Sequence, residues 1–515
     1  MTETPVIAFG PTPLTPDDVV RIARREARAI LDPAPGFRAC IDAGAAFLDR
    51  LLAEDGVIYG VTTGYGDSCT VSIPPDLVME LPHHLFTYHG CGLGEHFDEE
   101  ATRAILAARL ASLSCGYSGV SWALLEQLQA LLENDILPLI PSEGSVGASG
   151  DLTPLSYVAA ALCGEREVRF RGEVILASTA LAACGLRPLR LRPKEGLAIM
   201  NGTAVMTALA CLALDRAEQL ARLATRITAL AVVASGGNPH HFDETLFSVK
   251  PHPGLQQVAR NLRADLGIGQ ASRNDHRLQD RYSLRCAPHV IGVLEDALPF
   301  LRTLISNELN SANDNPIIDG VGERVLHGGH FYGGHIAFAM DSLKNLTANI
   351  ADLLDRQMAL LVDARYNHGL PANLSGASGS RATINHGLKA LQISVSAWTA
   401  EALKHTMPAS VFSRSTECHN QDKVSMGTIA ARDALRVLTL TEQVVVALLI
   451  TVRQGITLRE RCPEGALPLQ AEAATFLADL NARIPFIEED VALEPLLRRL
   501  LADLHARTWR PYAAS

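Results

Sequence analysis

The chain has 515 residues, and its 45 basic and 56 acidic side chains give a formal net charge of −11 at pH 7. This length suggests about two to four domains or one large continuous architecture, and the acidic balance does not point to nucleic acid or an anionic membrane as a partner. Hydrophobic residues make up 48% of the chain, charged residues 20%, and the mean hydropathy is +0.13. These values exclude disorder and favour a large helical core or surface hidden between subunits.

The predicted elements are mostly helices. A low aromatic content of 5%, with abundant alanine and leucine, favours helix over sheet. A cap signal at Thr15 to Asp18 predicts a first helix, and apolar residues at helical spacing predict two more over 101–113 and 123–135. Alternating residues predict one hairpin over 164–177. After residue 200 the pattern predicts long helices over 203–234, 289–309, 336–363, 383–406 and 428–455.

This order predicts two domains. Residues 1–200 would form a smaller N-terminal domain with short strands, and residues 201–515 a long helical bundle with C-terminal helices. The apolar run 443–452 is too short to span a bilayer, so no membrane partner is expected. The N-terminus lacks the pattern of a secretory signal, and the ten cysteines form no C-x-x-C pair. We therefore expect a cytoplasmic protein with neither a disulfide framework nor a structural metal site.

The Gly-rich segment 142–157, SEGSVGASGDLTPLSY, matches neither of the two common Gly-rich catalytic motifs. A phosphate-binding loop needs a lysine that this segment lacks, and a nucleophile elbow needs glycine where Asp151 stands. Taken by itself, the segment is adequately explained as a flexible turn before a helix. The same Ala-Ser-Gly triplet recurs at 377–379.

Six motifs in one order change this interpretation. They are IYGVTTGYG (58–66), GSVGASGDLTPLS (144–156), EGLAIMNGTAVM (195–206), YSLRCAPHVIG (282–292), NSANDNPIID (310–319) and NQDKVSMGT (420–428). Together they resemble the ammonia-lyase family that includes the histidine, phenylalanine and tyrosine ammonia-lyases and the related aminomutases. The resemblance runs from about residue 55 to beyond residue 426, which is most of the chain.

The resemblance implies a prosthetic group made from the chain itself. In this family an internal Ala-Ser-Gly cyclises and loses water to give methylideneimidazolone (MIO), and the matching residues are Ala148, Ser149 and Gly150. Releasing ammonia needs an electrophile, which no ordinary side chain provides. Glycines suit the cyclisation because a backbone nitrogen must approach a carbonyl closely. No metal or diffusible cofactor is implied, and the triplet at 377–379 lacks the flanking motif.

The resemblance also assigns roles to single residues. Tyr59 is the base that removes the β-proton, although a free tyrosine has a pKa near 10 and would need positive or hydrogen-bonding neighbours. Arg285 is the candidate for the substrate carboxylate, because a guanidinium makes paired bonds to a carboxylate. The remaining expected site residues are Tyr282 and Asn201 at the prosthetic group, and Gly66, Gln279, Asn313 and Phe331 around the substrate.

Substrate choice in the family depends on a selectivity pair, which is Tyr88–His89 in this chain. His89 favours a polar ring, either a phenol or an imidazole, over phenylalanine. Histidine lyases carry a glutamate where Gln421 follows Asn420, and a neutral amide lacks the charge that an imidazole would favour. The sequence therefore predicts L-tyrosine as substrate and trans-4-coumarate as product. Histidine, giving urocanate, is the alternative, and an aminomutase that re-adds ammonia at the β-carbon is another.

The family likeness finally implies a mostly α, histidine ammonia-lyase-like fold with a long central helical bundle. It also implies a homotetramer in which each active site draws residues from more than one subunit. His330 stands where the family usually has asparagine, a change that would alter the polar network of the site.

Overall fold

The computed structural model describes residues 4–54, 56–268, 278–463 and 465–512. Close contacts group the chain into two compact units. Unit 1 is made of Met1–Asp215, Leu301–Asp341 and Pro408–Arg432, and unit 2 of Arg216–Phe300, Ser342–Met407 and Asp433–Ser515. Each unit thus collects three separate stretches of sequence. The predicted division into residues 1–200 and 201–515 follows motif order rather than contacts, and it stays a prediction.

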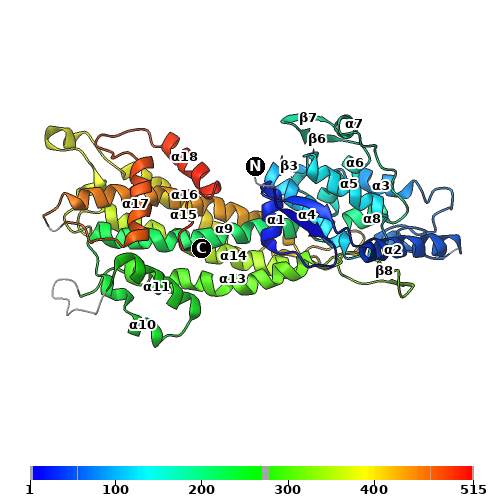
Figure 1. The fold of residues 1–515 in the computed structure, drawn as a ribbon, viewed down its shortest axis with the longest axis horizontal. Helices are drawn as coiled ribbons and strands as arrows, with labels where there is room; N and C mark the ends of the chain where they lie inside the picture. Colours follow the sequence, from blue (N-terminus) through cyan, green and yellow to red (C-terminus); the bar gives the residue numbers. More distant parts are fainter. Residues whose placement is uncertain (1–3, 55, 269–277, 464, 513–515) are drawn as a thin grey trace. The chain divides into compact units, whose positions relative to one another are not determined.

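Unit 1 combines helices with short strands (Figure 1). The helical elements wholly inside it are α1 (Pro16–Ala23), α2 (Pro35–Ala53), η1 (Gly66–Thr70), α3 (Leu81–Tyr88), α4 (Glu99–Ser114), α5 (Trp122–Glu133), α6 (Leu152–Leu162), α7 (Ala177–Ala183), α8 (Glu195–Met200) and η5 (Ser410–Phe412). The strands are β1 (Val6–Phe9), β2 (Arg28–Leu31), β3 (Leu93–His96), β4 (Leu137–Pro138), β5 (Pro141–Glu143), β6 (Glu167–Phe170), β7 (Glu173–Leu176), β8 (Ile317–Asp319) and β9 (Arg324–Leu326).

The strands of unit 1 form small separate sheets. Strands β1 and β2 pair in parallel, β3 pairs with β5, β8 pairs with β9, and β4, β6 and β7 make an antiparallel sheet. The predicted hairpin over 164–177 is confirmed as β6–β7, in which Val168 faces Ile175. The two helices predicted over 101–113 and 123–135 are confirmed as α4 and α5, within two residues at each end.

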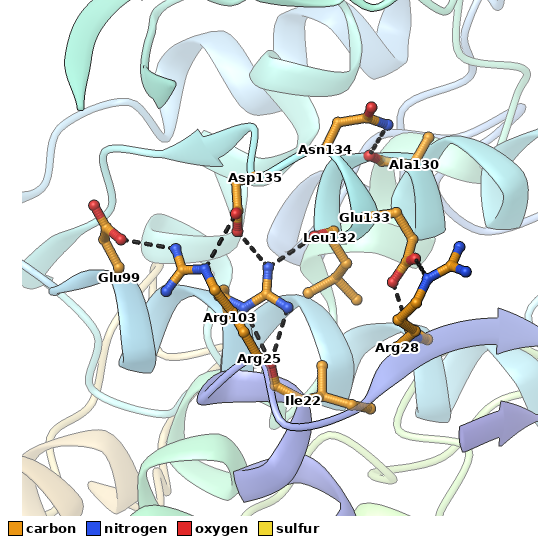
Figure 2. Close-up of polar contacts among 11 residues, drawn as sticks. Ile22, Arg25, Arg28, Glu99, Arg103, Ala130, Leu132, Glu133, Asn134 and Asp135 are labelled. Carbon is orange, nitrogen blue, oxygen red and sulfur yellow. Dashed lines mark hydrogen bonds and ion pairs between the residues drawn. The ribbon is translucent and has the colours of Figure 1, made fainter. Parts of the chain in front are cut away.

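One buried arginine joins three helices near the N-terminus. The Arg103 guanidinium of α4 donates to the carbonyl oxygen of Ile22 on α1 at 3.0 and 2.9 Å and to that of Leu132 on α5 at 2.7 Å, and it also pairs with Asp135 (Figure 2). Carbonyl groups near helix ends have no partner in their own helix, and this side chain satisfies two of them. The packing of α1 and α5 on α4 is therefore fixed by hydrogen bonds as well as by apolar contact.

The long predicted helices are present, and most have the expected bounds. The four that contribute to both units are α9 (Ala204–Ser235), α13 (Ala287–Leu309), α14 (Gly334–Val362) and α16 (Gly427–Glu460). Those wholly in unit 2 are η2 (Pro239–Phe242), α10 (Glu244–Ser248), α11 (Pro253–Leu266), α12 (Tyr282–Arg285), η3 (Ala372–Leu374), η4 (Gly379–Thr383), α15 (Lys389–Lys404), α17 (Ala471–Arg483) and α18 (Glu494–His505). The mostly α fold is confirmed.

The helix predicted over 383–406 begins later than expected, at Lys389. Gly387 has a φ of +53°, and the backbone N–H groups of His386 and Gly387 donate to the carboxylate of Asp490. This contact with a residue far along the chain holds the segment in a turn. Local periodicity could not reveal it.

Within unit 2 the long helices pack side by side (Figure 1). Gln357 of α14 donates to Thr228 of α9 at 2.9 Å, and Arg216 of α9 forms an ion pair with the buried Glu442 of α16 at 2.7 Å. By length and composition, Gly427–Glu460 could cross a membrane, but 78% of its most apolar window is buried inside the protein. A core helix passes the same test, so this helix is only weak evidence for a membrane.

Candidate active site

The segment between β5 and α6 adopts a backbone conformation that favours glycine. Gly147 and Gly150 have φ of +67° and +73°, in the left-handed region. A Cβ atom added at Gly150 would lie 2.1 Å from the carbonyl oxygen of Gly202, and one at Gly147 would lie 2.3 Å from Oγ of Ser425. Residues 147–150 are therefore packed directly against two other segments of unit 1.

Asp151 fixes the end of this segment. Its backbone N–H donates to the carbonyl of Gly202 at 2.8 Å. The buried carboxylate accepts hydrogen bonds from Ser145 at 3.0 Å, from the backbone N–H of Met206 at 3.0 Å, and from the hydroxyl of Thr428. Burial raises the pKa of Asp151 although these donors oppose the rise. The carboxylate thus ties the segment to the starts of α9 and α16.

Tyr59 lies on the loop between α2 and η1, with its ring half-buried. Its Oη accepts a hydrogen bond from the N–H of Gly66 at 2.7 Å, and its ring meets that of His327 edge-on, with centroids 6.3 Å apart. Burial raises the pKa of Tyr59, the Gly66 N–H opposes that rise, and the Glu417 carboxylate adds to it. The phenol is therefore protonated at neutral pH, and it could accept a proton only with added positive charge nearby or at alkaline pH.

The predicted selectivity pair stands at the end of α3. The rings of Tyr88 and His89 lie 4.3 Å apart, and burial raises the pKa of Tyr88 to about 12. Nδ1 of His89 is 2.9 Å from the carbonyl oxygen of Leu85, which can only accept, so Nδ1 carries the hydrogen and Nε2 is the acceptor nitrogen. Burial lowers the pKa of His89. Both side chains are thus uncharged at neutral pH.

Asn201 and Asn313 are both buried, but their amides differ in how they are bonded. Nδ2 of Asn313 donates to Glu308 at 3.1 Å, and the same Glu308 oxygen accepts from Thr203 at 2.6 Å. Asn201 caps α8, and no group among the described residues donates to its buried Oδ1. A buried acceptor without a donor is costly, so a water or a donor group of a ligand would bind favourably at this oxygen.

Three buried charged residues that sequence reasoning missed hold this region together. Lys194 pairs with Asp314 at 2.7 Å, and both side chains are fully buried. The buried guanidinium of Arg109 donates to the carbonyl oxygens of Asn313, at 3.4 Å, and Ala198, and burial lowers its pKa to about 10. These bonds link the chain just before Asn201 to the Asn313 turn. Asp314 lies inside the NSANDNPIID motif, but Lys194 and Arg109 lie outside every motif identified in the sequence.

Gln421 and Asn420 lie on a strained turn that contacts the Ala-Ser-Gly segment. Glu417, Cys418 and His419 have φ of +50°, +54° and +66° in succession. Nε2 of Gln421 donates to Oγ of Ser149 at 3.1 Å, and Nδ2 of Asn420 donates to Glu417 at 3.1 Å. Three consecutive non-glycine residues in the left-handed region are energetically costly, and such strain is often found at functional sites.

Glu417 is a fourth residue that sequence reasoning missed. Its carboxylate accepts the backbone N–H of Asp67 at 3.0 Å, and a Cβ atom added at Gly66 would overlap it. It therefore joins the Tyr59 loop to the turn that carries Asn420 and Gln421. Its position just before the NQDKVSMGT motif was the only available signal.

Phe331 and His330 lie in the turn before α14, where Phe331 is half-buried and His330 is exposed. The turn packs on α9, since a Cβ atom at Gly333 would lie 2.1 Å from Sδ of Met206. No hydrogen bond among the described residues joins Phe331 to Ser149 or Tyr59, so its lining role stays a prediction.

Gln279, Tyr282 and Arg285 belong to unit 2 and form a cluster of their own. Arg285 donates to Oε1 of Gln279 at 3.1 Å and to the carbonyl of Asp280 at 3.0 Å, and its guanidinium lies 4.7 Å from the ring centroid of Tyr282. The Tyr282 side chain is 72% exposed. The structure thus gathers the other predicted residues in unit 1 and these three in unit 2.

The described residues contain no group of three or more histidine, cysteine or acidic side chains that could hold a metal ion. Unit 1 instead offers a phenol, a neutral imidazole, two amides and a Ser149 hydroxyl within a tightly packed backbone. Such groups can move a proton and bind a polar ring, and the guanidinium of Arg285 can bind a carboxylate.

Comparisons with known proteins agree with this chemistry. The family model described as aromatic amino acid lyase matches residues 14–481. The chain is 37% identical over 498 residues to a histidine ammonia-lyase of Gloeobacter violaceus, covering 96% of this chain and 95% of that one. It is also similar to the solved structure of a tyrosine aminomutase from Streptomyces globisporus, with 32% identity and a TM-score of 0.89 over 98% of this chain and 97% of that one. A histidine ammonia-lyase structure from Trypanosoma cruzi is similar as well, with 28% identity and a TM-score of 0.88 over 98% of this chain and 94% of that one.

Fold and similarity together define a carbon–nitrogen lyase. The chain belongs to the aromatic amino acid lyase family and is an ammonia-lyase of its aromatic and histidine branch. The tyrosine preference predicted from the sequence is not confirmed. The histidine alternative agrees better with the curated relatives.

Proposed function

We propose that the chain releases ammonia from L-histidine and forms urocanate. The observation that carries this proposal is the 37% identity, over nearly the whole of both chains, to a relative named histidine ammonia-lyase. The tautomer of His89 agrees with it, since its Nε2 can accept a hydrogen bond from an imidazole N–H.

The same proposal includes MIO formed from Ala148, Ser149 and Gly150. One observation supports the fit of these residues to the group: Gly150 has a φ of +73° and lies where a Cβ would overlap Gly202. When present, the group supplies the electrophile that makes the substrate amine a better leaving group. Asn201 and Gln421 would hold it by hydrogen bonds from their amides.

The other residues bind the substrate and move its proton. Tyr59 takes the β-proton on Oη, where the Gly66 N–H stabilises the phenolate by a 2.7 Å hydrogen bond. Arg285, with Gln279 beside it, binds the substrate carboxylate, and Tyr282 assists at the prosthetic group. Tyr88 and His89 contact the ring, while Gly66, Asn313, Phe331 and Asn420 complete the surroundings of the substrate. The neutral state of His89 avoids charge repulsion with a protonated ring.

L-tyrosine is the second candidate substrate, with trans-4-coumarate as product. The observation that favours it is the tautomer of His89, whose acceptor nitrogen suits a phenol hydroxyl. Gln421 supplies no charge for an imidazole, because its amide is neutral. The likeness to a tyrosine aminomutase adds a further form of this candidate, in which ammonia returns to the β-carbon.

A substrate panel tests the proposal. Purified protein is incubated with L-histidine, L-tyrosine and L-phenylalanine, and each unsaturated acid is followed by absorbance while released ammonia is measured separately. Urocanate should form fastest. Preferred formation of trans-4-coumarate would establish the second candidate instead, and chiral analysis for β-amino acids distinguishes lyase from aminomutase. Ser149→Ala is the control, since it should keep the fold and lose all turnover.

The assembly is part of the proposal. A homotetramer with shared active sites would bring the exposed Tyr282 cluster of one subunit to the unit 1 residues of another. It would also cover exposed apolar residues on the long helices, such as Val293 and Phe300, which are 55% and 56% exposed. Light scattering at micromolar concentration should give four subunits, and a monomer would contradict the shared sites. A cytoplasmic location is proposed as well, and all ten cysteines are free thiols.

A further inference from the structure

The turn that carries Gln421 contains a hydrogen-bond chain directed at Ser149. Thr416 and Gln421 pair as an isolated antiparallel bridge, in which each backbone N–H donates to the other residue's carbonyl, at 3.0 and 3.2 Å. Their side chains are also bonded, because the Thr416 hydroxyl donates to Oε1 of Gln421 at 2.8 Å. The other end of the same amide, Nε2, donates to Oγ of Ser149 at 3.1 Å.

An amide has one acceptor end and one donor end, and its orientation depends on its partners. With Oε1 occupied by the Thr416 hydroxyl, the NH₂ end of Gln421 points at Ser149. Without this hydroxyl the amide would lose one partner and gain rotational freedom about its side-chain bonds. Thr416 thus controls a contact with Ser149 that it does not itself make.

We propose that Thr416 is a positioning residue that orients the Gln421 amide for the maturation of the Ala148–Ser149–Gly150 segment. This inference rests on the proposed function, because it requires that the segment cyclises.

The chemistry explains why the orientation matters at this atom. In the cyclisation the Gly150 nitrogen forms a bond to the Ala148 carbonyl carbon. The carbonyl oxygen then leaves as water with the hydrogens of the Gly150 and Ser149 nitrogens. Ser149 afterwards loses its Cα hydrogen and its Oγ hydroxyl as a second water, so no oxidant is needed. A hydrogen bond to Oγ makes the hydroxyl a better leaving group, and Gln421 supplies it.

The strained turn supports the same conclusion. The residues between the paired ends include Glu417, Cys418 and His419, all with positive φ. Such a conformation persists only where surrounding contacts determine it. The Thr416–Gln421 pairing closes the turn, and the bond from Asp67 to Glu417 holds its tip. The geometry is costly to maintain, and its effect is to place one amide against Ser149.

The test follows maturation directly. Wild type, Thr416→Val and Thr416→Ser are made by cell-free translation, and intact mass is measured over time for the loss of two waters. Val keeps the shape of threonine without the hydroxyl, while Ser keeps the hydroxyl. Thr475→Val is the matched control, because its exposed hydroxyl bonds only within its own helix. Circular dichroism and the thermal midpoint report folding.

We expect Thr416→Val to mature roughly two- to tenfold more slowly, the range that one hydrogen bond supports. Thr416→Ser and Thr475→Val should mature at the wild-type rate. The thermal midpoint of Thr416→Val should agree with that of the control variant Thr475→Val. Wild-type maturation in Thr416→Val would overturn the inference while leaving the proposed function intact. A wild-type chain that never loses the two waters would instead overturn the proposed function. Thr416→Ala replaces the valine variant if that variant does not fold, with the same expectation.

Discussion

The closeness of Gly150 to Gly202 makes a quantitative prediction about stability. Gly150→Ala places a methyl group 2.1 Å from the carbonyl oxygen of Gly202 and 2.6 Å from its nitrogen, at a φ of +73°. The left-handed conformation alone costs an alanine about 1–2 kcal/mol. Overpacking against backbone that cannot rotate away adds about 1–3 kcal/mol. Gly150→Ala should therefore lower the free energy of unfolding by about 2–5 kcal/mol.

Gly185→Ala provides the matched control for this prediction. Gly185 has nearly the same φ, +71°, and an added Cβ would meet no atom within 4 Å. Gly185→Ala should therefore lower the free energy of unfolding only by the cost of the left-handed conformation, about 1–2 kcal/mol. Both changes are compared by urea unfolding in a Ser149→Ala background, so that maturation does not alter the comparison. Equal destabilisation by the two variants would refute the close-approach argument. In the otherwise wild-type chain, Gly150→Ala should also keep both waters, as measured by intact mass.

Three further outcomes follow from the electrostatics of the site. Because burial raises the pKa of Tyr59 above its ordinary value of about 10, only a small phenolate fraction exists between pH 7 and 9, and this fraction grows about tenfold per pH unit. If the phenolate is the base, kcat/KM should increase by the same factor over this range. A plateau below pH 8 would show that the base titrates at lower pH. Glu417→Gln removes a negative charge that raises the pKa of Tyr59, so the pH profile of kcat/KM should move to lower pH. An unchanged profile would mean that the Glu417 carboxylate acts only through its hydrogen bond from Asp67. His89→Phe should lower kcat/KM for polar-ring substrates by about 10²-fold or more relative to L-phenylalanine in competition assays, and an unchanged ratio would exclude His89 from the ring pocket.

The sequence predicted those elements that depend on local pattern. Helices α4, α5 and α9 and the β6–β7 hairpin follow from periodicity and turn residues, and they lie within a few residues of the predicted bounds. The predicted start of α15 at residue 383 was wrong because Asp490, from outside the helix, accepts hydrogen bonds from the backbone of His386 and Gly387. The periodicity of a local segment carries no information about such long-range contacts.

The candidate site shows the same division between local and distant information. Motif order identified Tyr59, Ser149 and Gln421, and the structure joins the last two by a hydrogen bond and places Tyr59 against Gly66. Arg109 escaped notice because an arginine in an alanine-rich helix gives no indication that its guanidinium is buried against backbone carbonyls. Glu417 escaped notice because its contact to the Tyr59 loop joins residues about 350 positions apart.

The ring that this site accepts depends on how many hydrogen bonds it can satisfy. A neutral imidazole presents one N–H donor and one acceptor nitrogen, whereas a phenol can be satisfied by a single acceptor. His89 offers one acceptor, Nε2, because the Leu85 carbonyl accepts its Nδ1 hydrogen, and Oε1 of Gln421 already accepts a hydrogen bond from the Thr416 hydroxyl. Histidine therefore needs a second group to donate to its ring, and the protonated hydroxyl of Tyr88, whose ring lies 4.3 Å from that of His89, can supply this donor. Tyr88→Phe removes this donor, so it should reduce kcat/KM for histidine more than for tyrosine. The opposite ratio would indicate that the pocket is built for the phenol.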